Sequence, residues 1–201
     1  MKDAANNTPK DCSFAAMNQP SGRSAKVIEQ TRNWITEVVI KCNFCPFAAR
    51  EVKKNSIHYE VVQGAVSKSD ALQFFLNECK RLNENDSIET TLLIFPDSFL
   101  RFNEYLDLVK QTDKILRQNG YEGVYQAASF HPDYFFAGAP MDDAANFTNR
   151  SIYPMLHILR EASIEAVLEK YPEPERIPEA NIRFAREKGA AYMKMLRDSC
   201  L

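Results

Sequence analysis

Two histidines and several acidic side chains in the second half of the chain have the types and spacing that proton transfer or metal binding requires. His157 and Glu161 are four residues apart, which on a helix would place both on one face. An imidazole oriented by a carboxylate is a general base, and with His131 the pair could also bind zinc, iron or manganese. Asp142 or Asp143 would complete such a metal site. The alternative is a histidine at the edge of the core, hydrogen bonded to a carboxylate, with no chemical role.

The loop expected over residues 131–150 carries candidates for substrate binding. A connection of this length inside a domain is uncommon and is often functional. Arg150, with free N–H groups of the next helix, would bind a carboxylate or a phosphate. Asn149, Ser151 and Tyr134 would complete the contact with the substrate. Turns and helix caps use the same residue types, so a purely structural loop is an equally open interpretation.

Cys45 is a candidate nucleophile, with His131 as its base. Cys42 and Cys45 also have the C-x-x-C spacing of redox and zinc motifs. The pair is expected at the end of a helix, where the helix dipole disfavours a thiolate, and no second C-x-x-C completes a zinc site. The pattern therefore favours a tight turn with two half-buried thiols, while zinc completed by His131 or His157 remains an alternative.

The periodicity of the apolar residues predicts the elements that position these side chains. We expect a flexible tail over residues 1–23 and a single globular domain over residues 24–201. Their order favours an α/β domain with a small three-stranded, mainly parallel sheet, one N-terminal helix and two C-terminal helices; an α+β sheet is the alternative. Strands are predicted over 56–62, 90–95 and 124–130, and helices over 24–41, after a capping box at Ser67, from Asp97 to Gly120, from Pro154 to about Lys170, and after Pro178.

The composition excludes several functional classes. The six glycines are scattered and form neither a P-loop nor a G-x-G-x-x-G turn, so no nucleotide, flavin or haem cofactor is expected. A formal charge of −2, from 25 basic and 27 acidic residues, gives no sign of a nucleic-acid partner. No apolar run is long enough to cross a bilayer, and the N-terminus lacks the apolar segment of a secretory signal. We therefore expect a soluble cytoplasmic protein without a membrane partner, whose five scattered cysteines stay reduced.

Four stretches together form a long and specific pattern. They are Cys45-Pro-Phe-Ala48 after Trp34, Glu89-Thr-Thr-Leu-Leu-Ile94, Phe130-His-Pro-Asp-Tyr134, and Asn149-Arg-Ser-Ile-Tyr-Pro-Met-Leu-His-Ile-Leu-Arg-Glu161. From about residue 25 to about residue 195, the chain resembles a bacterial domain-of-unknown-function family, numbered 1415. The resemblance implies that His131, Cys45 and the 149–161 segment belong to one recurring arrangement. It implies no activity.

These observations predict a cytoplasmic enzyme of the hydrolase or lyase type, which acts on a small anionic molecule by metal-dependent or acid–base chemistry. One alternative is a non-catalytic module that uses the same loop to bind a ligand or another protein. The other is a thiol-dependent enzyme that uses a cysteine and a histidine.

Overall fold

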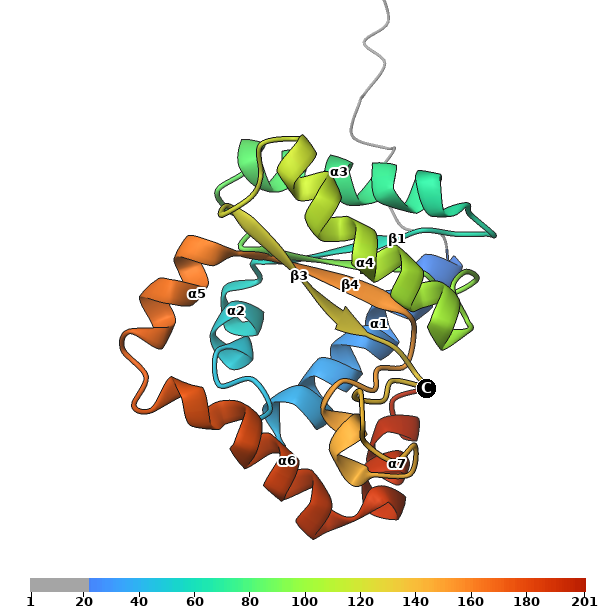
Figure 1. The fold of residues 1–201 in the computed structure, drawn as a ribbon, viewed down its shortest axis with the longest axis vertical. Coiled ribbons are helices and arrows are strands. Elements are labelled where there is room, and N and C mark those ends of the chain that lie inside the picture. The colour runs from blue at the N-terminus through green and yellow to red at the C-terminus, as the bar shows by residue number, and fades with distance from the viewer. Residues whose placement is uncertain (1–21) are drawn as a thin grey trace, which may run out of the picture.

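The computed structural model describes residues 22–201. The tail predicted for residues 1–23 lies outside them, apart from Gly22 and Arg23, which begin the first helix. A four-stranded sheet lies between two layers of helices (Figure 1). Within residues 22–201, no helix has both the length and the apolar character needed to span a membrane.

The sheet contains β1 (Ile57–Val61), β2 (Thr90–Ile94), β3 (Tyr125–Phe130) and β4 (Met155–Arg160), in the order β1-β2-β4-β3. β1 and β2 are parallel, whereas β4 is antiparallel to both of its neighbours. The mixed α/β character is therefore confirmed, and the three expected strands are present. The prediction of a three-stranded, mainly parallel sheet is wrong, because a fourth strand lies between β2 and β3.

β4 occupies the first part of the segment that the sequence predicts as a helix from Pro154. A short apolar run fits a strand buried on both faces as well as a buried helix, and periodicity does not distinguish the two. Pairing with β2 on one side and β3 on the other satisfies the backbone hydrogen bonds of this segment, and it therefore forms a strand. Only the remainder is helical, as α5 (Glu161–Leu168). His157 and Glu161 therefore do not share a helix face.

α3 (Lys68–Glu84) and α4 (Phe102–Gln118) cover one face of the sheet (Figure 1). α3 begins with the predicted capping box, in which the Ser67 hydroxyl accepts a hydrogen bond from the Asp70 N–H at 3.2 Å. The fully buried core on this face includes Phe75, Leu93, Tyr105, Leu156 and Ile158.

The prediction of Asp97 as the N-cap of α4 is wrong by four residues, because the N-cap is Arg101. Asp97 does not cap a helix, because its carboxylate accepts a hydrogen bond from the Gly64 N–H at 2.9 Å and pairs with Arg23. These contacts hold the turn after β1 beside the end of β2. The chain then passes through Phe99, whose φ is +57°, before α4 begins.

The other face is covered by helices from both ends of the described chain (Figure 1). α1 (Gly22–Trp34) continues directly into a π-helix, η2 (Ile35–Ile40), and α2 (Ala48–Lys54) follows. The single final helix expected from the sequence is divided in two at Gly189, whose φ of +81° favours glycine. The later elements are η3 (Ala144–Thr148), η4 (Pro174–Arg176), α6 (Ile177–Lys188) and α7 (Ala190–Asp198).

Candidate functional site

A cavity of about 280 Å³ lies between the sheet and the helices of its second face. Its lining includes Leu92, His157 and Ala128, which are direct neighbours across β2, β4 and β3. Because Ala128 has a small side chain, it leaves space beside the imidazole of His157. The other walls are mainly apolar and include Ile35, Val39, Phe130, Leu159, Ile164 and Val167.

The hydrogen bonds of His157 determine which of its ring nitrogens carries the proton. Thr90 Oγ1 lies 2.6 Å from the carbonyl oxygen of Ile158 and must donate its only proton to it. The same Oγ1 lies 2.7 Å from His157 Nε2, which therefore donates to Thr90. Nδ1 of His157 then carries a lone pair, and it has no hydrogen-bond partner within residues 22–201. Burial lowers the pKa of His157 to about 4, so the ring is neutral near pH 7.

Trp34 contributes an unpaired donor in the wall of the same cavity. Its indole Nε1 is buried and has no hydrogen-bond partner in the part of the chain that the structure describes. Buried polar groups without a partner are rare in folded proteins, since each carries a desolvation cost. Trp34 also ends α1 where the six-residue π-helix begins. π-helices are uncommon and often occur at functional sites.

Cys45 also lines the cavity, with a partly buried side chain. Cys42 is buried outside it, and both cysteines are free thiols. Burial raises the pKa of Cys42, which keeps that thiol protonated near pH 7. Of the two cysteines in the C-x-x-C motif, only Cys45 therefore has access to the cavity.

Three of the four charged residues at the cavity, Arg50, Glu51 and Arg160, already have protein partners; the carboxylate of the fourth, Glu89, has none within residues 22–201. Glu51 accepts a hydrogen bond from Ser56 at 2.6 Å and pairs with Arg50 at 2.5 Å. Arg160 donates to backbone carbonyls, among them that of Ile88 at 3.1 Å. The cavity is therefore mainly apolar, and His157 supplies a hydrogen-bond acceptor that no protein group uses.

His131 lies on the opposite side of the sheet from this cavity. Its Nε2 donates to the Phe99 carbonyl at 2.9 Å, and its Nδ1 accepts from the Asp133 N–H at 3.0 Å. The ring is fully buried against Phe102 and Tyr105 of α4. Burial also lowers its pKa, so it is a neutral side chain with both nitrogens in use. This geometry gives His131 a structural position and does not bring it to His157 or Cys45.

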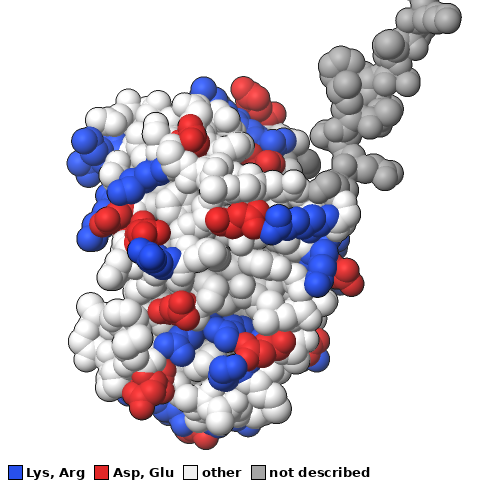
Figure 2. All heavy atoms as spheres, turned by 90° about the vertical axis from the view of Figure 1, so that its right-hand side faces the viewer, with Lys and Arg blue, Asp and Glu red and all other residues white. Residues whose placement is uncertain are grey.

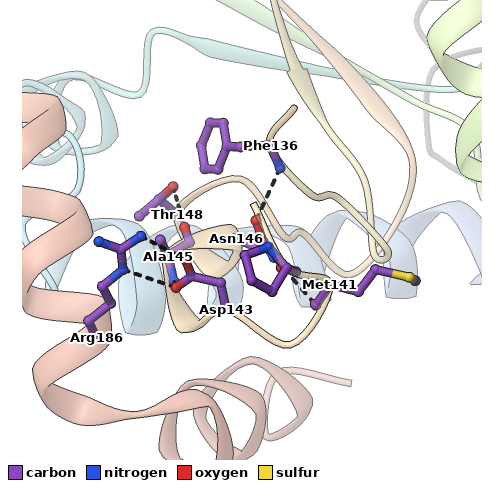
Figure 3. A network of polar contacts seen from close by, with 8 residues as sticks. Phe136, Met141, Asp143, Ala145, Asn146, Thr148 and Arg186 are labelled. Carbon is purple, nitrogen blue, oxygen red and sulfur yellow. Dashed lines mark hydrogen bonds and ion pairs between the residues drawn. The ribbon is translucent and has the colours of Figure 1, made fainter. Parts of the chain in front are cut away.

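The loop over 131–150 is held by its own side chains (Figure 3). Asn146 is fully buried; its amide oxygen accepts from the Phe136 N–H at 3.1 Å, and its amide nitrogen donates to the Pro140 carbonyl at 2.9 Å. Asp143 caps η3 through the Ala145 N–H and accepts two hydrogen bonds from Arg186 of α6. Arg186 thereby lowers the pKa of Asp143, which stays ionised as a structural group.

The side chains predicted to bind substrate are divided between structural contacts and a second hollow. Asn149 donates to the Ser129 carbonyl at 3.2 Å, and the fully buried Ser151 donates to that of Tyr153 at 2.5 Å. Arg150 donates to the backbone carbonyl of Tyr134 at 2.8 Å, and it lines a surface cleft outside the His157 cavity. The structure therefore does not gather these residues around one substrate.

Residues 26–195 match the family described as "Protein of unknown function (DUF1415)". The chain belongs to the DUF1415 family. No curated protein and no solved structure matches it.

In this DUF1415 domain, the five residues predicted to bind a metal do not converge. His157 lies in the cavity, His131 lies across the sheet, Glu161 begins α5 outside the cavity lining, Asp142 is exposed, and Asp143 pairs with Arg186. These side chains do not fit a shared metal ion, and their predicted metal-binding and catalytic roles have no support in this geometry.

The described part of the DUF1415 domain has one other group whose ligand atoms are close together, namely His58, Glu60 and Glu78. His58 Nε2 lies 3.4 Å from Glu60 and 3.7 Å from Glu78. Arg81, however, donates to both oxygens of Glu78 at 3.0 and 3.1 Å. Its guanidinium already supplies positive charge there, so this group is a weak candidate for a metal site.

Several residues of the DUF1415 cavity were not found by sequence reasoning. Thr90 fixes the tautomer of His157 and Ala128 leaves the space beside it, but both have the appearance of ordinary strand residues. Trp34 offers a signal, because it is the only tryptophan in the chain and precedes the C-x-x-C motif. Its unpaired N–H depends on the packing of the folded chain and cannot be inferred from the sequence.

Proposed function

We propose that this DUF1415 domain binds a small, mainly apolar molecule that donates a hydrogen bond to Nδ1 of His157. The observation that carries the proposal is an acceptor without a protein partner in a mainly apolar cavity. Ligand sites commonly combine apolar walls with a few polar groups that orient the ligand. The Trp34 N–H in the wall is a further polar group that a ligand could use.

The cavity volume limits the size of the ligand. A cavity of about 150 Å³ accommodates benzene, so about 280 Å³ has room for roughly a dozen non-hydrogen atoms. A single ring with one or two short substituents has this size. Three of the four charged residues at the cavity have protein partners and the fourth, Glu89, is itself an anion, so a neutral ligand fits this site better than the small anion expected from the sequence.

Ligand binding fits His157 better than acid–base catalysis does. A general base is most effective when its pKa is close to the working pH. With a pKa of about 4, the His157 imidazole is a weak base near pH 7 but remains a good hydrogen-bond acceptor. The hydrolase or lyase activity predicted from the sequence is therefore less well supported than binding.

A thiol-dependent reaction is a second candidate function, because Cys45 lines the same cavity. His157 would take the part that the sequence assigned to His131. Alkylation of Cys45 by iodoacetamide at neutral pH tests this candidate, with Cys45→Ser as the unreactive control. Rapid labelling that a cavity ligand slows would support thiol chemistry, and slow labelling would exclude it.

Phenol and toluene are suitable probes for the binding proposal, because they have similar shapes and only phenol donates a hydrogen bond. Calorimetry and ligand-observed NMR should show that phenol binds about tenfold more tightly than toluene. A difference of this size corresponds to the free energy of one hydrogen bond. His157→Leu should remove this preference while circular dichroism confirms the fold. Failure of phenol to bind, or equal binding of both probes to the unmodified protein, would refute the proposal.

Two substitutions on β3 provide a matched control for the position of the ligand. Ala128→Leu should fill the space beside His157 and weaken both probes. Gln126→Leu adds an apolar side chain on the same strand, two residues away and outside the cavity, and should leave both affinities unchanged. Binding that survives Ala128→Leu would place the probes elsewhere and contradict the proposed site.

A further inference from the structure

A second hollow, here called the cationic cleft, lies between the start of α4, the loop after β3, and α7. Its volume is about 780 Å³. Four basic side chains line it, Arg101, Arg150, Lys194 and Arg197, together with two acidic ones, Glu104 and Asp133. Figure 2 views this side of the molecule, where Lys and Arg side chains gather with Asp and Glu in the lower half.

Arg150 is the basic residue whose charge is least compensated. Its Nε and Nη2 donate to the backbone carbonyls of Tyr134 and Met141, at 2.8 and 2.7 Å. No carboxylate lies within ion-pair distance of it in residues 22–201, and its Nη1 has no hydrogen-bond partner there. Burial and the nearby Arg197 lower the pKa of Arg150, an effect that Asp133 opposes. A partly buried guanidinium of this kind favours a bound anion.

The guanidinium groups of Arg197 and Arg150 both lie near the ring of Phe147. The carbon Cζ of Arg197 lies 5.6 Å from the centre of the Phe147 ring, and that of Arg150 lies 4.8 Å from it. One carboxylate, Asp198, pairs with both Arg197 and Lys194. The two cations therefore share a single carboxylate, and the four basic side chains of the cleft outnumber its two acidic ones.

The start of α4 adds to the positive electrostatic potential of the cleft. Its N-cap residue is Arg101, and no side chain from residues 22–201 caps the first turn of this 17-residue helix. Unpaired N–H groups and the positive end of the helix dipole favour an anion there. Among the described residues, Arg101 pairs only with the exposed Glu104, at 3.5 Å. Phe135 and Met141 add apolar surface to the cleft.

We propose that the cationic cleft binds a small organic phosphate, with the phosphate near Arg150 and the start of α4 and the organic part against Phe135 and Met141. Donors from separate elements suit the tetrahedral oxygens of a phosphate better than the planar pair of a carboxylate. This site is separate from the His157 cavity, because the two hollows share no lining residue. The inference therefore does not depend on the function proposed for the cavity.

Calorimetry with phenyl phosphate tests the proposal, with inorganic phosphate and benzoate as comparison ligands. We expect phenyl phosphate to bind most tightly, since benzoate carries less charge and inorganic phosphate lacks the apolar part. Raising the salt concentration should weaken binding. Failure of phenyl phosphate to bind at low salt, or tighter binding of benzoate, would overturn the proposal.

Two arginines of α4 give a matched pair of variants. Arg101 and Arg117 lie at opposite ends of the helix, both are largely exposed, and each pairs with one glutamate. Arg101→Gln should weaken phenyl phosphate about threefold to tenfold, whereas Arg117→Gln should leave its affinity unchanged. Equal effects of the two would indicate a response to net charge alone and would refute the site.

Arg150→Gln should abolish binding, but it also removes contacts that hold the loop. Lys194→Gln is the second test at a side chain that is 65% exposed, and it should weaken binding without affecting the fold. Ala128→Leu, in the other hollow, should leave phenyl phosphate binding unchanged. Loss of binding in Ala128→Leu would assign phenyl phosphate to the His157 cavity and contradict the cleft proposal, whatever phenol does.

Discussion

Replacement of His157 by Gln should remove a specific part of the acid sensitivity of the fold. In the folded protein, burial lowers the pKa of His157 to about 4, while an unfolded chain has the ordinary histidine value of about 6.5. Between these values the unfolded state binds a proton that the folded state does not. The free energy of unfolding contributed by His157 must therefore fall as the pH falls.

The two pKa values give the size of this effect. The contribution is close to zero at about pH 7.5, reaches about 2 kcal/mol of lost stability at about pH 5, and about 3 kcal/mol at about pH 4. A Gln at position 157 does not titrate. The stability of His157→Gln relative to the unmodified protein should therefore rise by these amounts over the same pH range.

Urea denaturation of both proteins from about pH 7.5 to about pH 4 measures this difference. All other titrating groups are common to the two proteins, so subtracting the curves leaves the contribution of residue 157. The offset at neutral pH reports the packing cost of Gln and does not enter the argument. A difference that is independent of pH would mean that His157 is not desolvated and would refute the reasoning.

Four further substitutions test the polar contacts. Thr90→Val leaves the His157 Nε2–H without its partner, removes one hydrogen bond to the Ile158 carbonyl, and should cost about 1–3 kcal/mol. Thr91→Val removes a buried hydroxyl that has no partner in the described chain and should be neutral or stabilising; urea denaturation compares the two variants. Asn146→Asp turns a carboxylate oxygen toward the Pro140 carbonyl and should lower stability by about 3 kcal/mol, seen as a lower melting temperature. Ser67→Ala removes the cap of α3 and should cost about 1 kcal/mol in the same urea assay, and no loss would contradict the observed capping box.

The secondary structure was predicted most accurately where residues close together in the sequence determine it. The capping box at Ser67 and the apolar run of β2 are visible within a few residues, and both elements form as expected. β4 was mistaken for a helix, because what makes it a strand is its pairing with β2 and β3, which lie about 65 and 30 residues earlier in the chain. Pro154 and the i,i+4 spacing of His157 and Glu161 are equally compatible with a helix.

This one error explains why the candidate site was only partly found. On a strand, side chains alternate between faces, so His157 is turned toward the second face of the sheet while Leu156 and Ile158 pack against α3 and α4. His131 follows β3 and packs against α4. The sequence could identify both histidines, but only the three-dimensional arrangement separates them. Cys45 and His157 do share a cavity, whereas Arg150 belongs to the cationic cleft.

The cavity itself is an argument for a ligand. At about 24 cal/mol per Å³, an enclosed empty cavity of about 280 Å³ would forgo about 7 kcal/mol of packing, and this cavity forgoes less because its lining includes the exposed Arg50 and it opens to solvent. Water recovers little of this where the walls are apolar, because each water needs several polar partners. A larger residue at Ala128 would recover part of it, since the space lies beside that side chain. If the cavity serves only packing, Ala128→Leu should stabilise the fold at no functional cost. If it serves a ligand, the same variant should gain stability and lose binding together.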